Sequence, residues 1–296
     1  HLKITYLLIP LILCFSSVTV HAQSDANEFL IARYNFDGNI EDALGFYHGT
    51  VISSGTTTDP VFIEGYDGTP NSAVEFGDAN GYMINIGTFN PLAEGEADEQ
   101  TVTFWAYWYG STGRSQDIIN KRDNFSMVEM MWGINQHADT DHRLSVRNRD
   151  FEGPTDSEKG IPDSVWTHVA ITFSAEEVGF YMDGEWYQTL PFTHGTGVNA
   201  NINMGSAQNQ DGTLRAQDMY NGALDDVRFY TRILTADEIK VVYEGLSGVD
   251  DKSSTIPALS QNYPNPFNTS TTIKYSLARN AQTEIVVYDI LGHEVT

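Results

Sequence analysis

The feature that most constrains the fold is a succession of short runs rich in Val, Ile, Phe, Tyr and Thr, separated by clusters of Gly, Asn and Asp. This spacing is typical of a β-sandwich or barrel. In one run, Val169, Ile171 and Phe173 alternate with residues such as His168, so one face of that strand is apolar. We therefore expect an all-β domain of antiparallel sheets. The clearest runs cover residues 29–36, 72–76, 82–86, 102–108 and 166–173.

Two local signals refine this prediction. The dipeptide Asp183-Gly184 separates two strand-like runs within 178–189, and it supplies the positive φ angles that a two-residue hairpin turn needs. Thr235 and Glu238 form a capping-box pair ahead of an apolar stripe, which predicts a helix that ends before the next glycine. We therefore expect a hairpin and one short C-terminal helix beside the sheets.

For the run 102–108, the sequence does not decide which face of the strand points to the core. Strand alternation places Phe104, Ala106 and Trp108 on one side, and it places Trp105 and Tyr107 on the other. Both sets are apolar or aromatic, and only one of them can face the core.

The N-terminus indicates export. Lys3 precedes an apolar run from Tyr6 to Val20, and Ala22 provides a small residue for cleavage. This run is shorter than the roughly 20 apolar residues that a membrane span needs. We therefore interpret residues 1–22 as a signal peptide rather than a membrane anchor.

Composition favours a folded domain that is stabilised by its core. Of the 296 residues, 41% are hydrophobic, which argues against disorder. The single cysteine, Cys14, lies in the predicted signal peptide, so we expect no disulfide in the mature chain. The net charge of -24 repels phosphate backbones and anionic lipid surfaces, so we expect no nucleic-acid partner. We also expect no transmembrane segment in the mature protein.

The C-terminal part carries a recognisable motif. A linker rich in Ser, Gly, Asp and Lys over 246–258 leads to Tyr-Pro-Asn-Pro-Phe-Asn at 263–268, and the strand-like runs 272–277 and 284–289 follow. In this order the pieces resemble the C-terminal sorting domain of the type IX secretion system of Bacteroidota. The resemblance implies that residues 259–296 belong to a small β-sandwich tag read by outer-membrane secretion machinery.

Both ends of the sequence are expected to be cut. The first residue is His1 rather than Met, and Thr296 lies within a strand-like pattern, so the sorting domain would be truncated. A signal peptide together with a sorting tag predicts a protein that is secreted or held at the outer cell surface.

Seven short pieces between residues 28 and 245 follow one another in a characteristic order. They lie at 34–39, 73–77, 101–105, 166–170, 180–184, 220–230 and 234–239. In this order they resemble laminin-G-like (LamG) domains of the concanavalin A-like jellyroll family. The resemblance implies a β-sandwich of two antiparallel sheets over 28–245, with the first and last strands side by side.

The same resemblance implies a calcium site. Many relatives hold Ca²⁺ between the first and last strands, and the positions that match are Asp37, the carbonyl of Gly77, and Asp225, with Asp78 as a neighbour. Carboxylates and turn carbonyls are the oxygen ligands that Ca²⁺ needs. Asp225 is also expected on the same strand face as Val227 and Phe229, so its carboxylate would need a partner if that face is the core. The alternative to calcium is that Asp225 pairs with an arginine such as Arg33.

The sequence lacks the paired carboxylates of a retaining glycosidase. The nearest string, which begins at Glu96, has Thr101 where the second glutamate should stand. Glu129 has no carboxylate two or five residues further on. We therefore predict a non-catalytic binding module. A glycoside hydrolase or polysaccharide lyase with an unfamiliar arrangement, and a structural adhesin or spacer domain, are the alternatives.

Aromatic residues are the candidate ligand-binding groups, because a flat ring stacks on the apolar face of a sugar. Trp105 and Trp166 match core positions of the family that the chain resembles. Trp108, Trp132 and Trp186 are less constrained and are the predicted ligand-binding residues, with Trp132 lining a concave sheet. The predicted partner is a polysaccharide or a cell-surface glycan.

Overall fold

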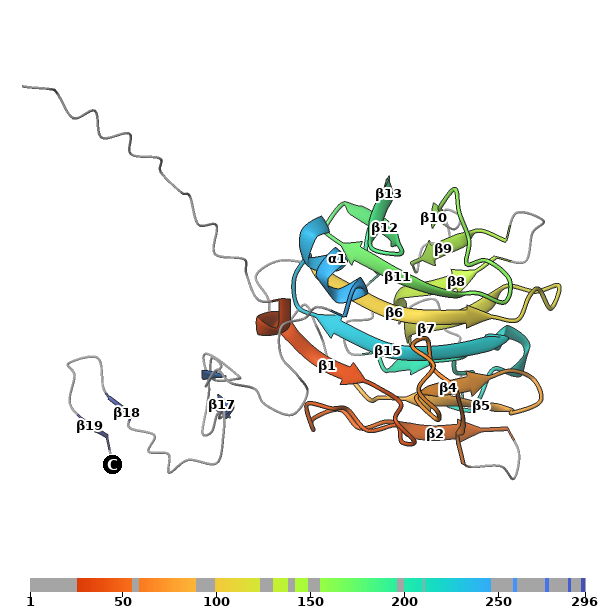
Figure 1. The fold of residues 1–296 in the computed structure, drawn as a ribbon, viewed down its shortest axis with the longest axis horizontal. Helices are drawn as coiled ribbons and strands as arrows, with labels where there is room; N and C mark the ends of the chain where they lie inside the picture. The colour runs from red at the N-terminus through yellow and green to blue at the C-terminus, as the bar shows by residue number, and fades with distance from the viewer. Residues whose placement is uncertain are drawn as a thin grey trace, which may run out of the picture.

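The structure is a computed structural model whose elements form a β-sandwich (Figure 1). The predicted signal peptide and most of the predicted linker and sorting domain lie outside the described residues. These described residues are 26–54, 59–88, 99–122, 130–137, 142–148, 155–195, 200–209, 211–245, 258–259, 275–276, 287–288 and 294–295.

One sheet, called sheet A here, faces the viewer in Figure 1. Within the described residues its order is β13-β12-β11-β6-β15-β4-β3, and β1 also pairs with β15. All the pairings are antiparallel. The strands are β1 (Leu30–Tyr34), β3 (Val61–Ile63), β4 (Ala73–Phe76), β6 (Gln100–Trp108), β11 (Trp166–Phe173), β12 (Glu177–Met182), β13 (Glu185–Pro191) and β15 (Gly222–Tyr230).

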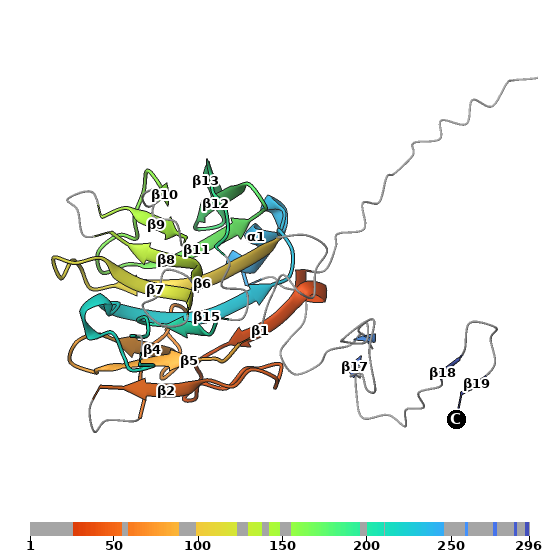
Figure 2. The ribbon, with the colours of Figure 1, turned by 180° about the vertical axis from the view of Figure 1, so that it is seen from behind.

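The second sheet, sheet B, lies behind sheet A and is seen from its own side in Figure 2. Its order in the part of the chain that is described is β10-β9-β8-β7-β14-β5-β2, again antiparallel. The strands are β2 (Thr50–Ser53), β5 (Tyr82–Asn85), β7 (Gln116–Arg122), β8 (Met130–Gln136), β9 (Leu144–Arg147), β10 (Thr155–Asp156) and β14 (Ile202–Met204). Two antiparallel sheets confirm the predicted all-β jellyroll.

The local signals are confirmed as well. β12 and β13 form a hairpin around Asp183 and Gly184, whose φ angles are 49° and 78°. Helix α1 (Ala236–Tyr243) begins after Thr235, and the side chains of Thr235 and Glu238 make both bonds of the capping box. The first and last strands of the domain, β1 and β15, are neighbours, as the family resemblance implies.

The core lies between the sheets, and its members show which face of β6 points inward. Phe104, Ala106 and Trp108 belong to the core cluster. Trp105 is therefore on the outer face of sheet A, where its ring stacks on Tyr66 at 4.2 Å between centroids. Trp166 shares that face, because it pairs with Tyr107 across the sheet. The expectation that Trp105 and Trp166 are core residues is therefore wrong, and both are half-buried.

β15 carries a bulge that changes which of its side chains face outward. The register shifts between Asp225 and Arg228, and Asp226 has a φ of 42°. Asp225 is therefore not on the core face with Val227. The arginines pair with Asp226 instead, because Arg33 Nε lies 2.8 Å from it and Arg228 Nη2 lies 2.6 Å from it. Burial alone would raise the pKa of Asp226, but Arg228 and Arg33 outweigh it and lower the pKa to about 2.

Several short elements complete the description. A 3₁₀ helix, η1 (Ala26–Phe29), precedes β1, and η3 (Ala216–Asp218) lies between β14 and β15. Toward the C-terminus, β16 (Ala258–Leu259) pairs with β17 (Tyr275–Ser276), and β18 (Val287–Tyr288) pairs with β19 (Glu294–Val295). No helix in the described part of the chain is both long and apolar enough to cross a membrane.

Replacing Asp226 tests the ion cluster at the bulge. Asp226→Asn removes the carboxylate that faces the buried guanidinium of Arg228, which is 2% exposed. We expect the free energy of unfolding to fall by about 3–5 kcal/mol in a denaturant titration, because one charge stays buried without its counter-charge. The exposed Glu41→Gln is the control. A loss no larger than that of the control would contradict this role.

Candidate functional site

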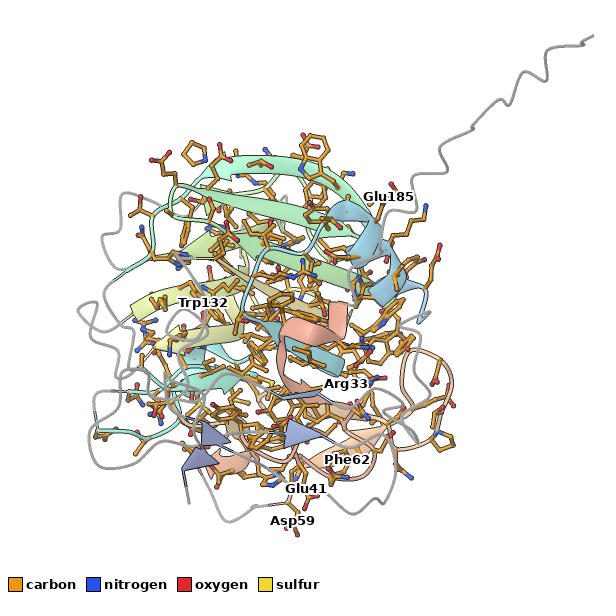
Figure 3. The ribbon with its side chains drawn as sticks, turned by 90° about the vertical axis from the view of Figure 1, so that its left-hand side faces the viewer. Arg33, Glu41, Asp59, Phe62, Trp132 and Glu185 are labelled. Atoms are coloured by element: carbon orange, nitrogen blue, oxygen red, sulfur yellow. The ribbon has the colours of Figure 1, made fainter. Side chains whose placement is uncertain are left out.

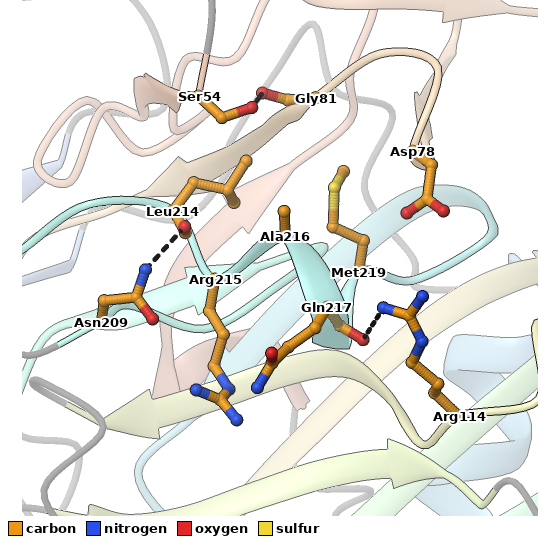
Figure 4. A pocket seen from close by; sticks show the side chains of 10 residues that line it. All are labelled: Ser54, Asp78, Gly81, Arg114, Asn209, Leu214, Arg215, Ala216, Gln217 and Met219. Carbon is orange, nitrogen blue, oxygen red and sulfur yellow. Dashed lines mark hydrogen bonds between the residues drawn. The ribbon is translucent and has the colours of Figure 1, made fainter.

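Two adjoining hollows lie on the outer face of sheet B and share Arg114, Arg215 and Gln217. The larger has a volume of about 740 Å³ and the smaller one of about 460 Å³. Both values fall in the range of small-molecule sites, roughly 300–1,000 Å³. Figure 4 shows the smaller hollow, with Arg114 reaching the carbonyl of Gln217 at its rim.

The floor of the larger hollow follows from strand alternation and from one bulge. Ile119, Ile134 and Val146 occupy paired positions on β7, β8 and β9, and all three belong to the core. On β8 and β9 the adjacent residues therefore point to the opposite face. On β7 the register shifts between Asp117 and Ile119, so Asp117 also points outward. Asp117 and Asn135 pair directly across β7 and β8 and line the hollow.

Ser145 continues this outward row on β9, where it pairs with Asn135. Arg147 lies two residues further along β9 and lines the hollow. Its Nη2 donates to Ser115 Oγ over 3.2 Å, which ties β9 to the turn before β7. The floor is therefore polar along three adjacent strands.

The connection between β14 and β15 forms one wall. Met83 on β5 is buried although it points away from the core, because Leu214 and Met219 of this connection cover it and Ile52 packs against them. This apolar contact holds η3 over sheet B. As a result Arg215, Gln217 and Asp218 face the hollow, and the side chains of Arg215 and Asp218 are ion-paired.

A row of asparagines supports the wall from below. Asn85 on β5, Asn203 on β14 and Asn120 on β7 occupy paired positions across the sheet. Asn85 Nδ2 donates to Asn203 Oδ1 over 2.8 Å, and Asn203 Nδ2 donates to Asn120 Oδ1 over 3.4 Å. Asn120 Nδ2 then donates to the carbonyl of Ser206 over 2.9 Å, which fixes the start of the connection.

The floor carboxylate has an unusual environment. Asp117 is 7% exposed, and its Oδ1 accepts a hydrogen bond from Asn135 Nδ2. Burial and the nearby Asp218 raise the pKa of Asp117 to about 7, against the opposing effect of Arg122 and other arginines around the hollow. The carboxyl is therefore only partly ionised near neutral pH.

The three predicted ligand-binding tryptophans lie in different surroundings. Trp132 is fully buried between the sheets and stacks on Phe173 at 5.4 Å between centroids (Figure 3). Trp108 is 4% exposed and donates through Nε1 to Gln116. Neither ring offers a face to a ligand, so their prediction as sugar-binding residues is corrected to a core role. Trp186 on β13 is 57% exposed, but it lies at the edge of sheet A, away from the hollow.

The predicted calcium ligands do not form a cluster. Among the described residues, no three His, Cys, Asp or Glu side chains are grouped as a metal would require. The carbonyl of Gly77 accepts two backbone N–H groups at 3.0 Å, and both oxygens of Asp225 accept backbone N–H groups. Asp37 is exposed, and Asp78 lines the smaller hollow. Ca²⁺ needs six to eight oxygen ligands, so calcium binding at these positions stays a prediction.

The residues that line the larger hollow were not among the site residues predicted from the sequence. One signal in the sequence could have indicated them. Residues 116–122 are mostly polar, and Asp117 and Arg122 flank the apolar pair at its centre. A mostly polar strand in the middle of a sandwich indicates that its outer face carries a polar site. Glu96 and Glu129, considered as catalytic residues, lie outside the described residues.

Comparison with known proteins gives the fold family. The family model described as "Concanavalin A-like lectin/glucanases superfamily" matches residues 80–240. No curated protein sequence matches the chain.

Solved structures share the architecture at low identity. Domain 4 of AbnA, a GH43 extracellular arabinanase from Geobacillus stearothermophilus, in complex with arabinotriose, is 20% identical with a TM-score of 0.55, covering 73% of this chain and 98% of that domain. A botulinum neurotoxin type C structure, from a protein whose cell entry depends on two ganglioside molecules, is 15% identical with a TM-score of 0.54, covering 75% and 52%. The binding domain of Paraclostridial Mosquitocidal Protein 1 is 15% identical with a TM-score of 0.53, covering 75% and 53%.

The environment of Asp117 predicts a pH-dependent stability. Its folded pKa of about 7 lies above the roughly 3.9 of an unfolded aspartate, so the native state holds a proton that the unfolded state releases. Stability should therefore fall as pH rises from about 4 to 7. Asp117→Asn cannot ionise, so its stability relative to wild type should rise over this window, by an amount on the order of 2–4 kcal/mol.

Thermal melting from pH 4.5 to 8 measures this difference, with the exposed Asp59→Asn as control. The quantity compared is the stability of the variant minus that of the wild type at each pH. The buried Asp225, whose pKa is raised to about 8, also makes stability depend on pH, but it does so equally in both proteins. A difference that does not change with pH would show that Asp117 is ionised throughout.

Proposed function

Because the chain belongs to the concanavalin A-like lectin/glucanase superfamily, we propose that it is a non-catalytic carbohydrate-binding module whose ligand lies in the hollows over sheet B. The observation that carries this proposal is the polar floor of β7, β8 and β9, set between a wall built from the β14–β15 connection and the turn before β7. Such a surface has hydrogen-bonding groups at several positions, which is what a polyhydroxylated chain needs.

The neighbours in structure support a binding role. One is a domain of an arabinanase seen with arabinotriose, and another belongs to a toxin that uses gangliosides. Both are said to engage carbohydrate, although they share no more than 20% identity with this chain. The proposal therefore rests on the geometry of the hollow in this protein, and the neighbours agree with it.

The carboxylates in the larger hollow do not favour catalysis. Asp117 is buried and bonded to Asn135, and Asp218 is ion-paired with Arg215. A glycosidase needs two carboxyl groups that flank the scissile bond and are open to substrate. Binding without cleavage is therefore the function that this arrangement supports best.

Export and calcium belong to the same proposal. The segment that resembles a signal peptide and the segment that resembles a type IX sorting domain support delivery of the module to the cell surface or beyond, where polysaccharides are met. Calcium at Asp37, Gly77, Asp78 and Asp225 stays a prediction, and binding measured with calcium and with a chelator tests it.

Filling the rim of the hollows tests the location of the site. Gln217 lines both hollows and is exposed, so Gln217→Trp should block them and weaken binding to a soluble polysaccharide by at least about tenfold. Thr213→Trp, on the same connection but outside both linings, is the matched control and should bind as wild type. Affinity electrophoresis against a panel of neutral and acidic polysaccharides measures the effect. Loss of binding in Trp186→Ala, with Gln217→Trp unaffected, would place the site on sheet A.

Deleting the C-terminal segment tests export. Removal of residues from Leu259 onward should leave the protein in the periplasm of its host, because the outer-membrane step would lack its signal. Immunoblotting of periplasmic and surface fractions measures the distribution, with deletion of the linker 246–258 alone as a comparison. Normal surface delivery without the segment would contradict the sorting role.

A further inference from the structure

Arginines converge on the larger hollow. Arg114, Arg122, Arg147 and Arg215 all line it, and they come from the turn before β7, the end of β7, the end of β9 and the connection after β14. The whole chain has only 16 Lys and Arg residues and a net charge of -24. Four of these 16 cationic residues therefore meet at one place in a strongly acidic protein.

Among the described residues that line the hollow, arginines outnumber carboxylates. The carboxylates in its lining are those of Asp117 and Asp218, and Asp218 is already paired with Arg215. The carboxyl of Asp117 carries only part of a charge near neutral pH, because burial raises its pKa to about 7. Like charges that share a partly buried site repel one another. A bound anion would offset part of this repulsion.

Buried polar atoms beneath the arginines also point to a ligand. Asp117 Oδ2 and Asn135 Oδ1 make no hydrogen bond within the described part of the chain, and both residues are more than nine-tenths buried. Both residues line the hollow and pair across β7 and β8. Buried polar groups are normally hydrogen-bonded, and both oxygens can accept a bond from a sugar hydroxyl.

We propose that the larger hollow binds an anionic polysaccharide, with the arginines holding its acidic groups and the floor of β7, β8 and β9 holding its hydroxyls. The inference rests on the proposed carbohydrate-binding function and names its ligand class. A guanidinium presents two parallel N–H groups that match the two oxygens of a carboxylate, and it serves a sulfate ester in the same way. Uronic acid units and sulfated sugars are the two sources of such groups.

Because the surface of the protein is acidic, an anionic polysaccharide would be attracted only by groups close to it in the hollow. At physiological salt the Debye length is about 8 Å, so repulsion from distant acidic residues is screened, while contacts inside the hollow persist. A nucleic-acid duplex, with one negative charge per roughly 1.7 Å of its axis, would meet more repulsion from the acidic surface than a uronic acid chain with one charge per sugar unit. The observations therefore favour a polysaccharide over a nucleic acid.

A matched pair of ligands gives the test. Polygalacturonate and its methyl ester have the same backbone, and only the first carries free carboxylates. Calorimetric titration of the full chain should show binding of polygalacturonate and affinity lower by about tenfold or more for the ester. Arg114→Gln and Arg147→Gln should each weaken binding of polygalacturonate by about tenfold to hundredfold. Lys240→Gln removes one positive charge on the exposed helix α1, far from the lining, and should change nothing.

Thermal melting of each variant shows that it is folded before it is titrated. Preference for dextran sulfate over polygalacturonate, with the same loss in both arginine variants, supports the proposal and identifies sulfate as the acidic group. Equal binding of the ester, or binding that ignores the arginine variants, overturns the anionic specificity and leaves the carbohydrate-binding function standing. Absence of binding to every neutral and acidic polysaccharide removes the proposed function. Equal affinity for a single-stranded oligonucleotide would also overturn the inference.

Discussion

The two-residue alternation of side chains along β7, β8 and β9 underlies both the core and the candidate site. Ile119, Ile134 and Val146 face sheet A and close the sandwich, and alternation sends Asn135 to the outer face. Asp117 lies two residues from Ile119, and it reaches the outer face because a bulge shifts the register between them. A shift of one residue in register would bury the polar row and expose the apolar row. The packing that stabilises the fold, together with this bulge, therefore also holds the polar floor in place.

The open floor becomes a hollow because a second element packs on the sheet. The β14–β15 connection places Leu214 and Met219 over Met83, and the asparagine row from Asn85 to Asn120 holds its start. One half of the outer face of sheet B is thereby covered, and the larger hollow lies over the half formed by β7, β8 and β9. Arginines from separate elements then meet around this half, which explains how an acidic chain carries a locally basic site.

Much of the fold could be predicted from the sequence, because it depends on local chemistry. The apolar alternation of 166–173, the turn at Asp183-Gly184 and the capping pair of Thr235 and Glu238 each specify their element directly. The bulge at Asp226 could not be predicted in this way, and it reverses the expected direction of Asp225. The tryptophans were misplaced for a related reason, since an aromatic ring serves a core and a sugar site equally well, and only the packing of Trp132 on Phe173 distinguishes them.

The arginine cluster depends on tertiary structure, because its members are distant in sequence and meet only after the connection folds over the sheet. A crystal structure of the chain with an oligogalacturonate tests the central claim most directly. The account predicts the sugar in the hollow over β7, β8 and β9, with a carboxylate of the ligand against the guanidinium groups of Arg114 or Arg147. A ligand seated on the outer face of sheet A, against Trp105 or Trp186, would contradict it.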